Sequence, residues 1–448
     1  MRKISYLLLF IVLANTLVVS AQNKKSKSKA GKPNIIFILA DDLGIGNVSC
    51  YGADFYKTPQ IDQLAKNGMR FNHAYTAPLC GPSRALIVTG RYAFRTGAVN
   101  QDQTAQMDVS KEVMIPAVLK PAGYVSSMIG KWGQLPTAGP SAFGFDDYID
   151  FKGSGVYWNK GKKATSYIVN GETKPLKDNE YMPDLMHDHL VDFLTANKNK
   201  PFFVYYSLSH VHGEIQRTPD SKPDSKDLYS DNIAYMDKLV GKLMSVLDDL
   251  KLRENTLVVF FGDNGTAKGA IELSTIGGKA LVGKKGTMEE CGSLVPMVAY
   301  WPSVIKPGRV TDQLIDASDF LPTFAEIASA SLPTKNVIDG KSFLPLLQGK
   351  KGNPRDWIFV ELGNKWYVRD AQYKLDREGN LFDMSQSPFE EKTVAAGSKD
   401  KASEDARKKL QAVLDELNPA GGIIDNGDGS GRHAGKEKGK DKGKDKED

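Results

Sequence analysis

Residues 34–42 read NIIFILADD, an unbroken apolar run that is followed at once by two aspartates. A short apolar run without alternation is typical of a strand buried on both faces of a parallel sheet. The same texture returns in GYVSSMIGKW, PFFVYYSLS and TLVVFFGDNG, at residues 123–132, 201–209 and 256–265. Between these runs lie amphipathic segments that read as helices, at residues 58–69, 182–197 and 231–250. The alternation predicts an α/β fold with a large, mostly parallel central sheet between helices.

The two ends of the chain differ in composition from this alternating core. Residues 1–21 have a basic start, an apolar stretch and a small-residue ending, which predicts a signal peptide removed on export. The alternative, an uncleaved anchor, is disfavoured because the apolar stretch is shorter than the ~20 residues that a span needs. Residues 22–32 and 421–448 are rich in lysine and polar residues, so we expect a disordered linker and a disordered charged tail. The mature protein is therefore expected to be exported, periplasmic or secreted, without stable membrane insertion.

The remaining chain is expected to divide near residue 333. Residues 33–332 carry the strand–helix alternation, whereas residues 333–420 contain short strands at hairpin spacing and a closing helix over 402–417. We therefore predict a main domain and a smaller C-terminal α+β subdomain. The net charge is +5, and much of the lysine lies at the two ends, so no nucleic-acid surface is expected. Nothing in the sequence indicates an oligomeric state.

Oxygen-bearing side chains follow two of the predicted strands. Asp41 and Asp42 follow the first run, and Asp263 and Asn264 follow the run at 256–262. Ligands of parallel sheets bind beyond the carboxyl ends of the strands, where these side chains would meet. Three carboxylates and one amide oxygen suit a hard cation such as Ca²⁺ or Mg²⁺. The alternative is that they are ordinary solvated acids at strand ends.

One of the three cysteines stands in TAPLCGPSRALIVTGRY, residues 76–92. Pro82 favours the first turn of a helix, and Gly90 fits its end. Cys80 would then lie at the helix N-terminus, where free N–H groups and the helix dipole favour anions. Arg84, four residues on, can fold back toward the same place. The alternative is a buried structural cysteine at a loop–helix junction.

At this point the chain resembles a known family. CGPSR followed by LIVTGR is similar to the signature of the type I sulfatases, which belong to the alkaline-phosphatase superfamily. ADDLGIGNVSCYG, GYVSSMIGKW, GDNGT and GKKGTMEECGSLVP resemble further elements of that family, in the same order. The resemblance implies an alkaline-phosphatase-like fold and an arylsulfatase-like sulfuric ester hydrolase, with residues 33–332 as the catalytic domain. It also implies that Cys80 is oxidised to formylglycine by a formylglycine-generating enzyme during export.

The resemblance implies a mechanism and a role for each matching residue. One hydroxyl of the hydrated aldehyde attacks sulfur and displaces an alcohol, and the second then expels sulfate. The cofactors implied are Ca²⁺, with Mg²⁺ as an alternative, and formylglycine itself; the substrate is a sulfate ester, expected to be an aryl or carbohydrate sulfate. The implied metal ligands are Asp41, Asp42, Asp263, Asn264 and modified Cys80. The implied catalytic residues are Cys80, Arg84 on the aldehyde hydrate, Lys131 and Lys285 on sulfate or the diol, and His212, or else His210, as proton donor to the leaving group.

The sequence departs from the family pattern at the second signature. Gly133 follows GKW where the family usually has a histidine that contacts formylglycine, so His210 or a water is a candidate substitute. Asn47 and Cys291 are minor departures, since they stand where many members carry Asp and Gly. Two alternative functions therefore stay open. One is a phosphodiesterase or phosphonate monoester hydrolase on the same scaffold, and the other, favoured by Gly133, is a sulfated-glycan binding protein without turnover.

The sequence offers two further histidines and three aromatic residues as site candidates. His187 and His189 lie two residues apart on a predicted helix and so point to different faces, which favours solvated helix histidines. Trp132, Tyr157 and Trp158 could line a sugar-binding rim, or could equally belong to the core.

Overall fold

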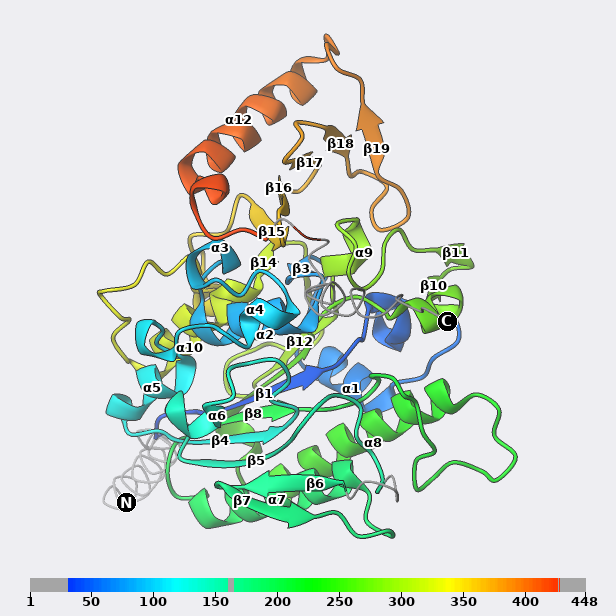
Figure 1. Ribbon diagram of the computed structural model, residues 1–448, viewed down its shortest axis with the longest axis vertical. Helices are drawn as coiled ribbons and strands as arrows, with labels where there is room; N and C mark the ends of the chain where they lie inside the picture. The colour runs from blue at the N-terminus through cyan, green and yellow to red at the C-terminus, as the bar shows by residue number, and fades with distance from the viewer. Residues whose placement is uncertain (1–30, 160–164, 426, 428–448) are drawn as a thin grey trace, which may run out of the picture. The chain divides into compact units, whose positions relative to one another are not determined.

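A ten-stranded mixed sheet forms the centre of the computed structural model, which describes residues 31–159, 165–425 and 427 (Figure 1). The predicted signal peptide, most of the linker and most of the tail lie outside the described residues. In spatial order the strands are β13 (Arg309–Thr311), β2 (Met69–Phe71), β12 (Met297–Tyr300), β9 (Thr256–Gly262), β1 (Asn34–Ala40), β8 (Phe202–Ser207), β4 (Val125–Gly130), β5 (Asp147–Phe151), β6 (Ser166–Val169) and β7 (Glu172–Pro175).

The middle of this sheet is parallel, as predicted. β9, β1, β8, β4 and β5 are successive parallel neighbours, whereas β12 on one side and β6 and β7 on the other pair antiparallel. Every residue of β1, β8 and β9 is buried, which is why their sequences do not alternate. The predicted strands at 34–40, 123–132, 201–209 and 256–265 are therefore confirmed, although the last three are shorter than predicted.

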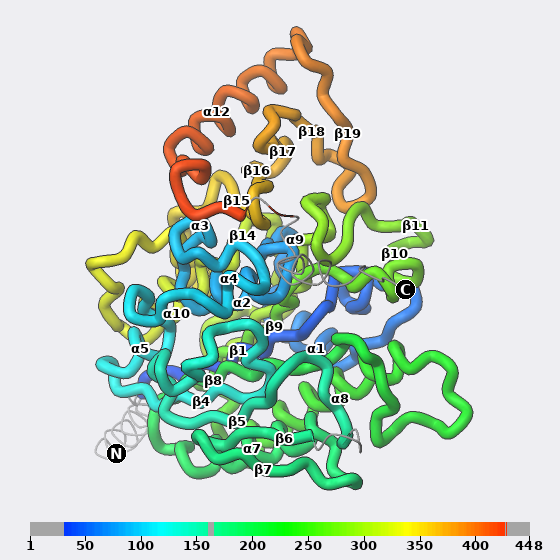
Figure 2. The backbone as a smooth tube through the Cα atoms, in the orientation of Figure 1, coloured from blue at the N-terminus to red at the C-terminus, as the bar shows by residue number. Residues whose placement is uncertain are grey.

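Helices cover both faces of the sheet (Figures 1 and 2). Alternate residues of β1 enter two separate hydrophobic clusters, because successive side chains of a strand point to opposite faces. One cluster includes residues of α2 (Cys80–Thr89), α5 (Ile115–Leu119) and α10 (Phe320–Ala328). The other includes residues of α1 (Pro59–Asn67), α7 (Met182–Asn197) and α8 (Leu228–Asp249).

The helix boundaries differ from prediction mainly at their starts. α8 begins at Leu228, three residues before the predicted start, because the side chain of Asp227 accepts a hydrogen bond from Ser230 N. Thr58 precedes α1 but does not cap it, since its hydroxyl contacts Ser49 and Asp62 instead.

A five-stranded antiparallel sheet follows near the C-terminus, with α12 (Lys401–Leu417) contacting β16 and β17. Its strands are β15 (Ile358–Leu362), β16 (Lys365–Arg369), β17 (Tyr373–Asp376), β18 (Leu381–Asp383) and β19 (Lys392–Val394). The predicted hairpin strands and closing helix are thus present, within the same compact unit as the large sheet. The short elements are α3 (Ala93–Thr96), α4 (Gln101–Thr104), α6 (Gly139–Ala142), α9 (Glu290–Ser293), α11 (Leu344–Leu347), β3 (Ala74–Tyr75), β10 (Thr275–Ile276), β11 (Lys279–Ala280) and β14 (Ile315–Asp316).

The first residues of the predicted solvated tail are hydrogen-bonded to the rest of the chain, although residues 421–423 are exposed. Ile423 N donates to Phe94 O at 2.9 Å, and Asp425 Oδ2 accepts a hydrogen bond from Asn100 at 2.7 Å. The two isoleucines at 423 and 424 give this short stretch apolar surface that the charged repeat after it lacks. Within the described residues, no helix is both long and apolar enough to cross a membrane.

Candidate active site

The parallel strands at the centre of the large sheet deliver polar side chains to their shared carboxyl end. β9, β1, β8 and β4 are parallel, so their carboxyl ends lie together. Asp41 and Asp42 follow β1, and Asp263 and Asn264 follow β9, where Ala40 and Gly262 are in register. Lys131 follows β4 directly.

Hydrogen bonds join three of the four predicted metal-binding residues of the strand ends. Asp42 N donates to Asp263 Oδ1 at 3.0 Å, and Asn264 Nδ2 donates to Asp42 Oδ1 at 2.9 Å. All four residues are buried. Asp42 has a positive φ of 59°, which turns the chain sharply after the strand and aims its carboxylate back toward the β9 end.

Three cations meet these acids. Arg84 Nη2 donates to Asp263 Oδ2 at 2.9 Å, and Lys131 Nζ donates to Asp41 Oδ2 at 2.5 Å. Lys285 Nζ lies 2.5 Å from Asp42 Oδ1. Arg84 and Lys131 are fully buried. Three buried carboxylates therefore face three cations, each acid with a partner of its own.

Cys80 lies among these charges, at the first residue of α2. Asp41, Cys80 and Asp263 each offer one metal-ligating atom, and these three atoms lie within 4.8 Å of one another. α2 ends at Thr89 and is followed by Gly90, which has a positive φ of 66° and stops the helix as the sequence predicted. Burial raises the pKa of the Cys80 thiol in spite of the nearby Lys131 and Lys285. The unmodified thiol is thus a poor nucleophile at neutral pH.

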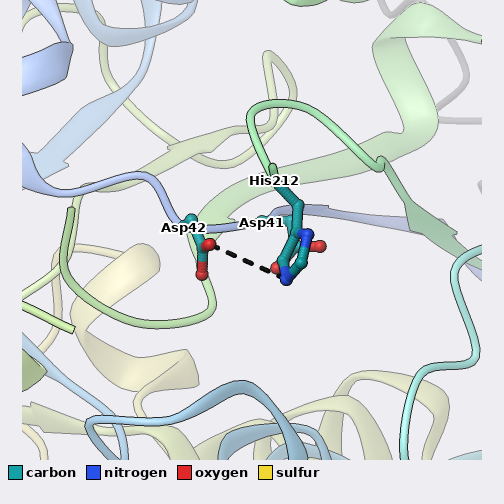
Figure 3. Close-up of side chains that lie close together, drawn as sticks. All are labelled: Asp41, Asp42 and His212. Atoms are coloured by element: carbon teal, nitrogen blue, oxygen red, sulfur yellow. Dashed lines mark ion pairs between the residues drawn. The ribbon is translucent and has the colours of Figure 1, made fainter. Parts of the chain in front are cut away.

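The side chain of His212 lies at the same carboxyl end of the strands, whereas the ring of His210 packs against tyrosines. Figure 3 shows His212 directed toward Asp42, with its Nε2 3.9 Å from Asp42 Oδ2. One ligand atom each from Asp41, Asp42 and His212 lie within 4.8 Å of one another. His210 is fully buried, and its Nε2 lies 3.0 Å from the hydroxyl of Tyr181. Its peptide oxygen, not its ring, meets the site, because it accepts the hydrogen bond of Asp41 N.

The charges of the site shift its titrating groups in different directions. Burial opposes ionisation of Asp41, but the charges of Lys131, His212 and Arg84 hold its pKa well below the usual value. Burial, with the Asp41 carboxylate beside it, raises the pKa of Asp263 to about 7 in spite of Arg84. The acids repel one another, so the cluster would be stabilised by further positive charge.

Two buried acceptor atoms of the cluster support a cation site. Among the described residues, Asp41 Oδ1 and Asn264 Oδ1 are buried and have no hydrogen-bond partner. A buried acceptor without a partner costs about 1–3 kcal/mol. A hard cation would satisfy both atoms with the oxygen ligands that it prefers, so the residues fit Ca²⁺ or Mg²⁺.

Two positions that depart from the family pattern are explained locally. Asn47 is buried, and its Oδ1 accepts from Thr266 Oγ1 at 2.5 Å, so it fixes the loop after β9. Cys291 is buried in α9 and packs with Tyr75 and Leu294.

The predicted solvation of His187 is corrected by the packing. His187 is not solvated: it is 3% exposed, with its Nδ1 3.3 Å from Tyr206 Oη. His189 is partly exposed, but its Nε2 lies 2.8 Å from Asp147 Oδ2. A helix of an α/β fold packs against the sheet along a broad face, which reaches both histidines.

The aromatic candidates lie mainly in the core. Trp132 packs against Phe143 and Phe145, and Tyr157 is fully buried and donates to Ser209 O at 3.0 Å. Trp158 is half-buried, and its Nε1 donates to Arg217 O.

The family model "Sulfatase" matches residues 33–330 of the chain, and the model "N-sulphoglucosamine sulphohydrolase, C-terminal" matches residues 281–419. The chain belongs to the sulfatase family. Sulfatases are sulfuric ester hydrolases, so the predicted family and class of enzyme are confirmed. N-acetylgalactosamine-6-sulfatase of Canis lupus familiaris is 31% identical to this sulfatase over 391 residues, covering 80% of this chain and 74% of that protein. Arylsulfatase A of Homo sapiens is 33% identical over 385 residues, covering 77% of this chain and 75% of that protein.

Solved sulfatase structures share the fold. The crystal structure of Ps i-CgsB in complex with k-i-k-neocarrahexaose superposes on this sulfatase with a TM-score of 0.74 and 27% identity, covering 86% of this chain and 92% of that one. The structure of BT4656 in complex with D-glucosamine-2-N,6-O-disulfate superposes with a TM-score of 0.70 and 22% identity, covering 86% and 97%. The predicted alkaline-phosphatase-like α/β fold is therefore confirmed.

Proposed function

We propose that the protein hydrolyses a sulfate ester with a formylglycine nucleophile made from Cys80, beside a bound Ca²⁺ ion. The observation that supports this most directly is the meeting of Cys80 with Asp41 and Asp263, whose ligand atoms lie within 4.8 Å of one another. No structural disulfide uses this cysteine, which is free and buried. When formed, the hydrated aldehyde would supply two hydroxyls on one carbon, one to attack sulfur and one whose proton loss lets sulfate leave.

Charge explains why such a site would bind a sulfate ester. Asp41, Asp42 and Asp263 are matched by three cations, so the cluster alone attracts no anion strongly. A divalent cation held by these acids and Asn264 would leave the pocket positive and would act as a Lewis acid on oxygen. The helix N-terminus at Cys80 adds to the attraction for an anion.

The chain's own residues would position the reacting groups. Arg84 holds Asp263 and also donates to Lys131 O at 2.9 Å, which fixes the start of α2 against the strand ends. Lys131 and Lys285 carry positive charge beside the place where sulfate oxygens gain charge, a stabilisation that matters most in the transition state. His212 would donate a proton to the leaving alcohol, from its position next to Asp42.

We further propose a carbohydrate sulfate as substrate and export as the route to it. Support comes from similarity to proteins named N-acetylgalactosamine-6-sulfatase and to Ps i-CgsB, whose structure contains k-i-k-neocarrahexaose. The basic and apolar start of the chain supports export, during which a formylglycine-generating enzyme would act on Cys80. Ca²⁺ is proposed over Mg²⁺ because carboxylates from two loops make an irregular oxygen set that Ca²⁺ tolerates better.

The test compares nitrophenyl sulfate with nitrophenyl phosphate diesters and phosphonate esters, on Ca²⁺-loaded protein. We expect kcat/KM for the sulfate to exceed that for the phosphorus esters by at least about 10²-fold, since transition-state contacts decide specificity. Faster turnover of a phosphorus ester would assign the scaffold to phosphodiesterase or phosphonate monoester chemistry instead. Retention of sulfated glycan without any sulfate release, by protein that bears the aldehyde, would assign it to binding alone.

A further inference from the structure

Two glutamines flank Cys80, and the mechanism above gives neither a task. Gln101 Nε2 donates a hydrogen bond to Cys80 Sγ at 3.1 Å, and Gln134 Oε1 lies 4.0 Å from the same sulfur. Gln101 is the first residue of α4, whereas Gln134 lies in the loop that begins at Lys131. Both side chains are partly buried. Two amides from separate segments of the chain therefore converge on one side chain.

The orientation of the Gln101 amide is fixed by its neighbours. Its Oε1 accepts a hydrogen bond from Gly81 N at 2.8 Å, which leaves Nε2 facing the sulfur. The helix that carries it is anchored at Asn100, whose side-chain oxygen accepts from Gln103 N and whose Nδ2 donates to Asp425. The donor to position 80 is thus held in place before any substrate binds, as an efficient catalytic contact requires.

Glycines on each side of Cys80 make the approach of both amides possible. A Cβ on Gly81 would lie 2.2 Å from Gln101 Oε1, so a larger residue would push the amide away. Gly133 has a φ of +74°, and a Cβ there would lie 3.2 Å from Arg84 Cδ. The left-handed turn at Gly133 is costly for other residues. The chain after Lys131 turns there, and Gln134 is the residue that reaches the sulfur.

We propose that Gln101 and Gln134 orient the nucleophile at position 80, Gln101 as a donor to one of its hydroxyls and Gln134 as an acceptor from the other. The inference rests on the proposed function, because only a hydrated aldehyde presents two hydroxyls at this position. An amide offers both a donor and an acceptor but takes up no proton near neutral pH. The pair therefore fixes the direction of the attacking oxygen and does not act as a base.

The two glutamines thus contact position 80 in place of the family's histidine, a role for which the sequence suggested His210. Among the residues that the structure describes, no hydrogen bond joins His210 to Cys80, and its ring packs against Tyr157, Tyr181 and Tyr235. The missing histidine at position 133 is thus compensated by amides from both sides. Loss of turnover is not an expected consequence of Gly133.

The same hydrogen bonds have an effect that does not depend on turnover. Donation to one hydroxyl and acceptance from the other stabilise the hydrate over the free aldehyde. Without the Gln101 amide, more of the side chain would stand as free aldehyde, which reacts with aminooxy reagents. Labelling by such a probe therefore reports the contact directly.

The experiment uses three variants of the full chain, each with its aldehyde content measured by peptide mass. Gln101→Leu removes the amide, and Gln101→Glu keeps an acceptor for Gly81 N but loses the donor. Gln103→Leu is the matched control, because it changes the same residue type on the same short helix and Gln103 Oε1 has no hydrogen-bond partner among the described residues. Measured per mole of aldehyde, kcat on nitrophenyl sulfate should fall at least about tenfold in both Gln101 variants, with KM little changed. Aminooxy labelling should become several-fold faster in both, and Gln103→Leu should match the wild type.

A fourth variant tests the second amide. Gln134→Leu should show the same two changes at smaller size, because its contact with the sulfur is longer. Wild-type kcat and labelling rates in aldehyde-bearing Gln101→Leu and Gln101→Glu would overturn the assignment. Wild-type protein that bears no aldehyde and releases no sulfate would overturn the proposed function itself, and this inference with it, so the two failures are told apart in the unmutated protein.

Discussion

At the scale of single residues, the candidate site is a set of buried charges that compensate one another. Lys131 neutralises Asp41 and Arg84 neutralises Asp263, all with their side chains fully buried. Removing one partner of such a pair leaves an unpaired buried charge, which costs about 3–5 kcal/mol. Substitutions that test chemistry at this site must therefore keep shape and hydrogen bonding, or their effects will report folding.

Cys80→Ser is such a change, because serine differs from cysteine by one atom. We expect turnover of nitrophenyl sulfate to fall by at least about 10³-fold, since a serine has no second oxygen with which to expel sulfate. Mass analysis after incubation with substrate should find sulfate retained on residue 80. Cys50→Ser, at a half-buried cysteine outside the cluster, should keep wild-type turnover. Continuous turnover by Cys80→Ser would refute a role for the aldehyde.

Asp263→Asn tests the cation site with the shape of the side chain kept. We expect Ca²⁺ affinity to fall by at least about tenfold in calorimetric titration, because one anionic ligand is lost. The control is Asp237→Asn, at a buried acid that accepts from Gln60 N and Ile61 N at the start of α1. That variant should bind Ca²⁺ as the wild type does. Equal affinity in Asp263→Asn would exclude Asp263 as a ligand.

At the scale of secondary-structure elements, the sequence predicted most of what positions the site. β1 and β9 are unbroken apolar runs that end in acids, and such runs have few other places to lie than the centre of a parallel sheet. Gln101 was not foreseen, because α4 is a four-residue helix in a polar segment without periodicity. Whether such a turn reaches Cys80 depends on tertiary packing, which local patterns do not encode.

The burial of His187 likewise depends on tertiary packing, and it predicts how the stability of the fold changes with pH. Burial lowers the pKa of His187 on α7 to about 4, below the usual value near 6.5. The unfolded chain therefore binds a proton between these values that the folded chain does not, so this group lowers stability as the pH falls from 6.5 toward 4. The free energy of unfolding of the wild type should drop between pH 7 and pH 5. In His187→Gln we expect this drop to be smaller by about 1–2 kcal/mol. Urea unfolding at the two pH values measures this, and equal losses would contradict it.

At the scale of the whole molecule, a buried ion pair joins the small sheet to α9. Arg369 on β16 contacts Glu290 of α9, which also accepts hydrogen bonds from Tyr75 and Ser387. α9 follows the loop that carries Lys285, so the small sheet supports a segment of the candidate site. The family match over residues 281–419 begins in that same loop.

Replacing one member of this ion pair should destabilise the fold more than replacing both. Arg369→Met leaves Glu290 buried without its cation, and we expect the free energy of unfolding to fall by about 3–5 kcal/mol. The double variant Arg369→Met with Glu290→Met should recover part of that loss, because no unpaired charge remains. Urea unfolding of both variants provides the comparison. A double variant less stable than the sum of the two single changes would show that the pair is not the source of the effect.

The most direct test of the proposed function is the mass of the peptide that spans Cys80, taken from protein made in its native host. We predict that residue 80 carries an aldehyde, detected as the mass of formylglycine and as reaction with an aminooxy probe. An unmodified thiol at that position in all of the protein would contradict it.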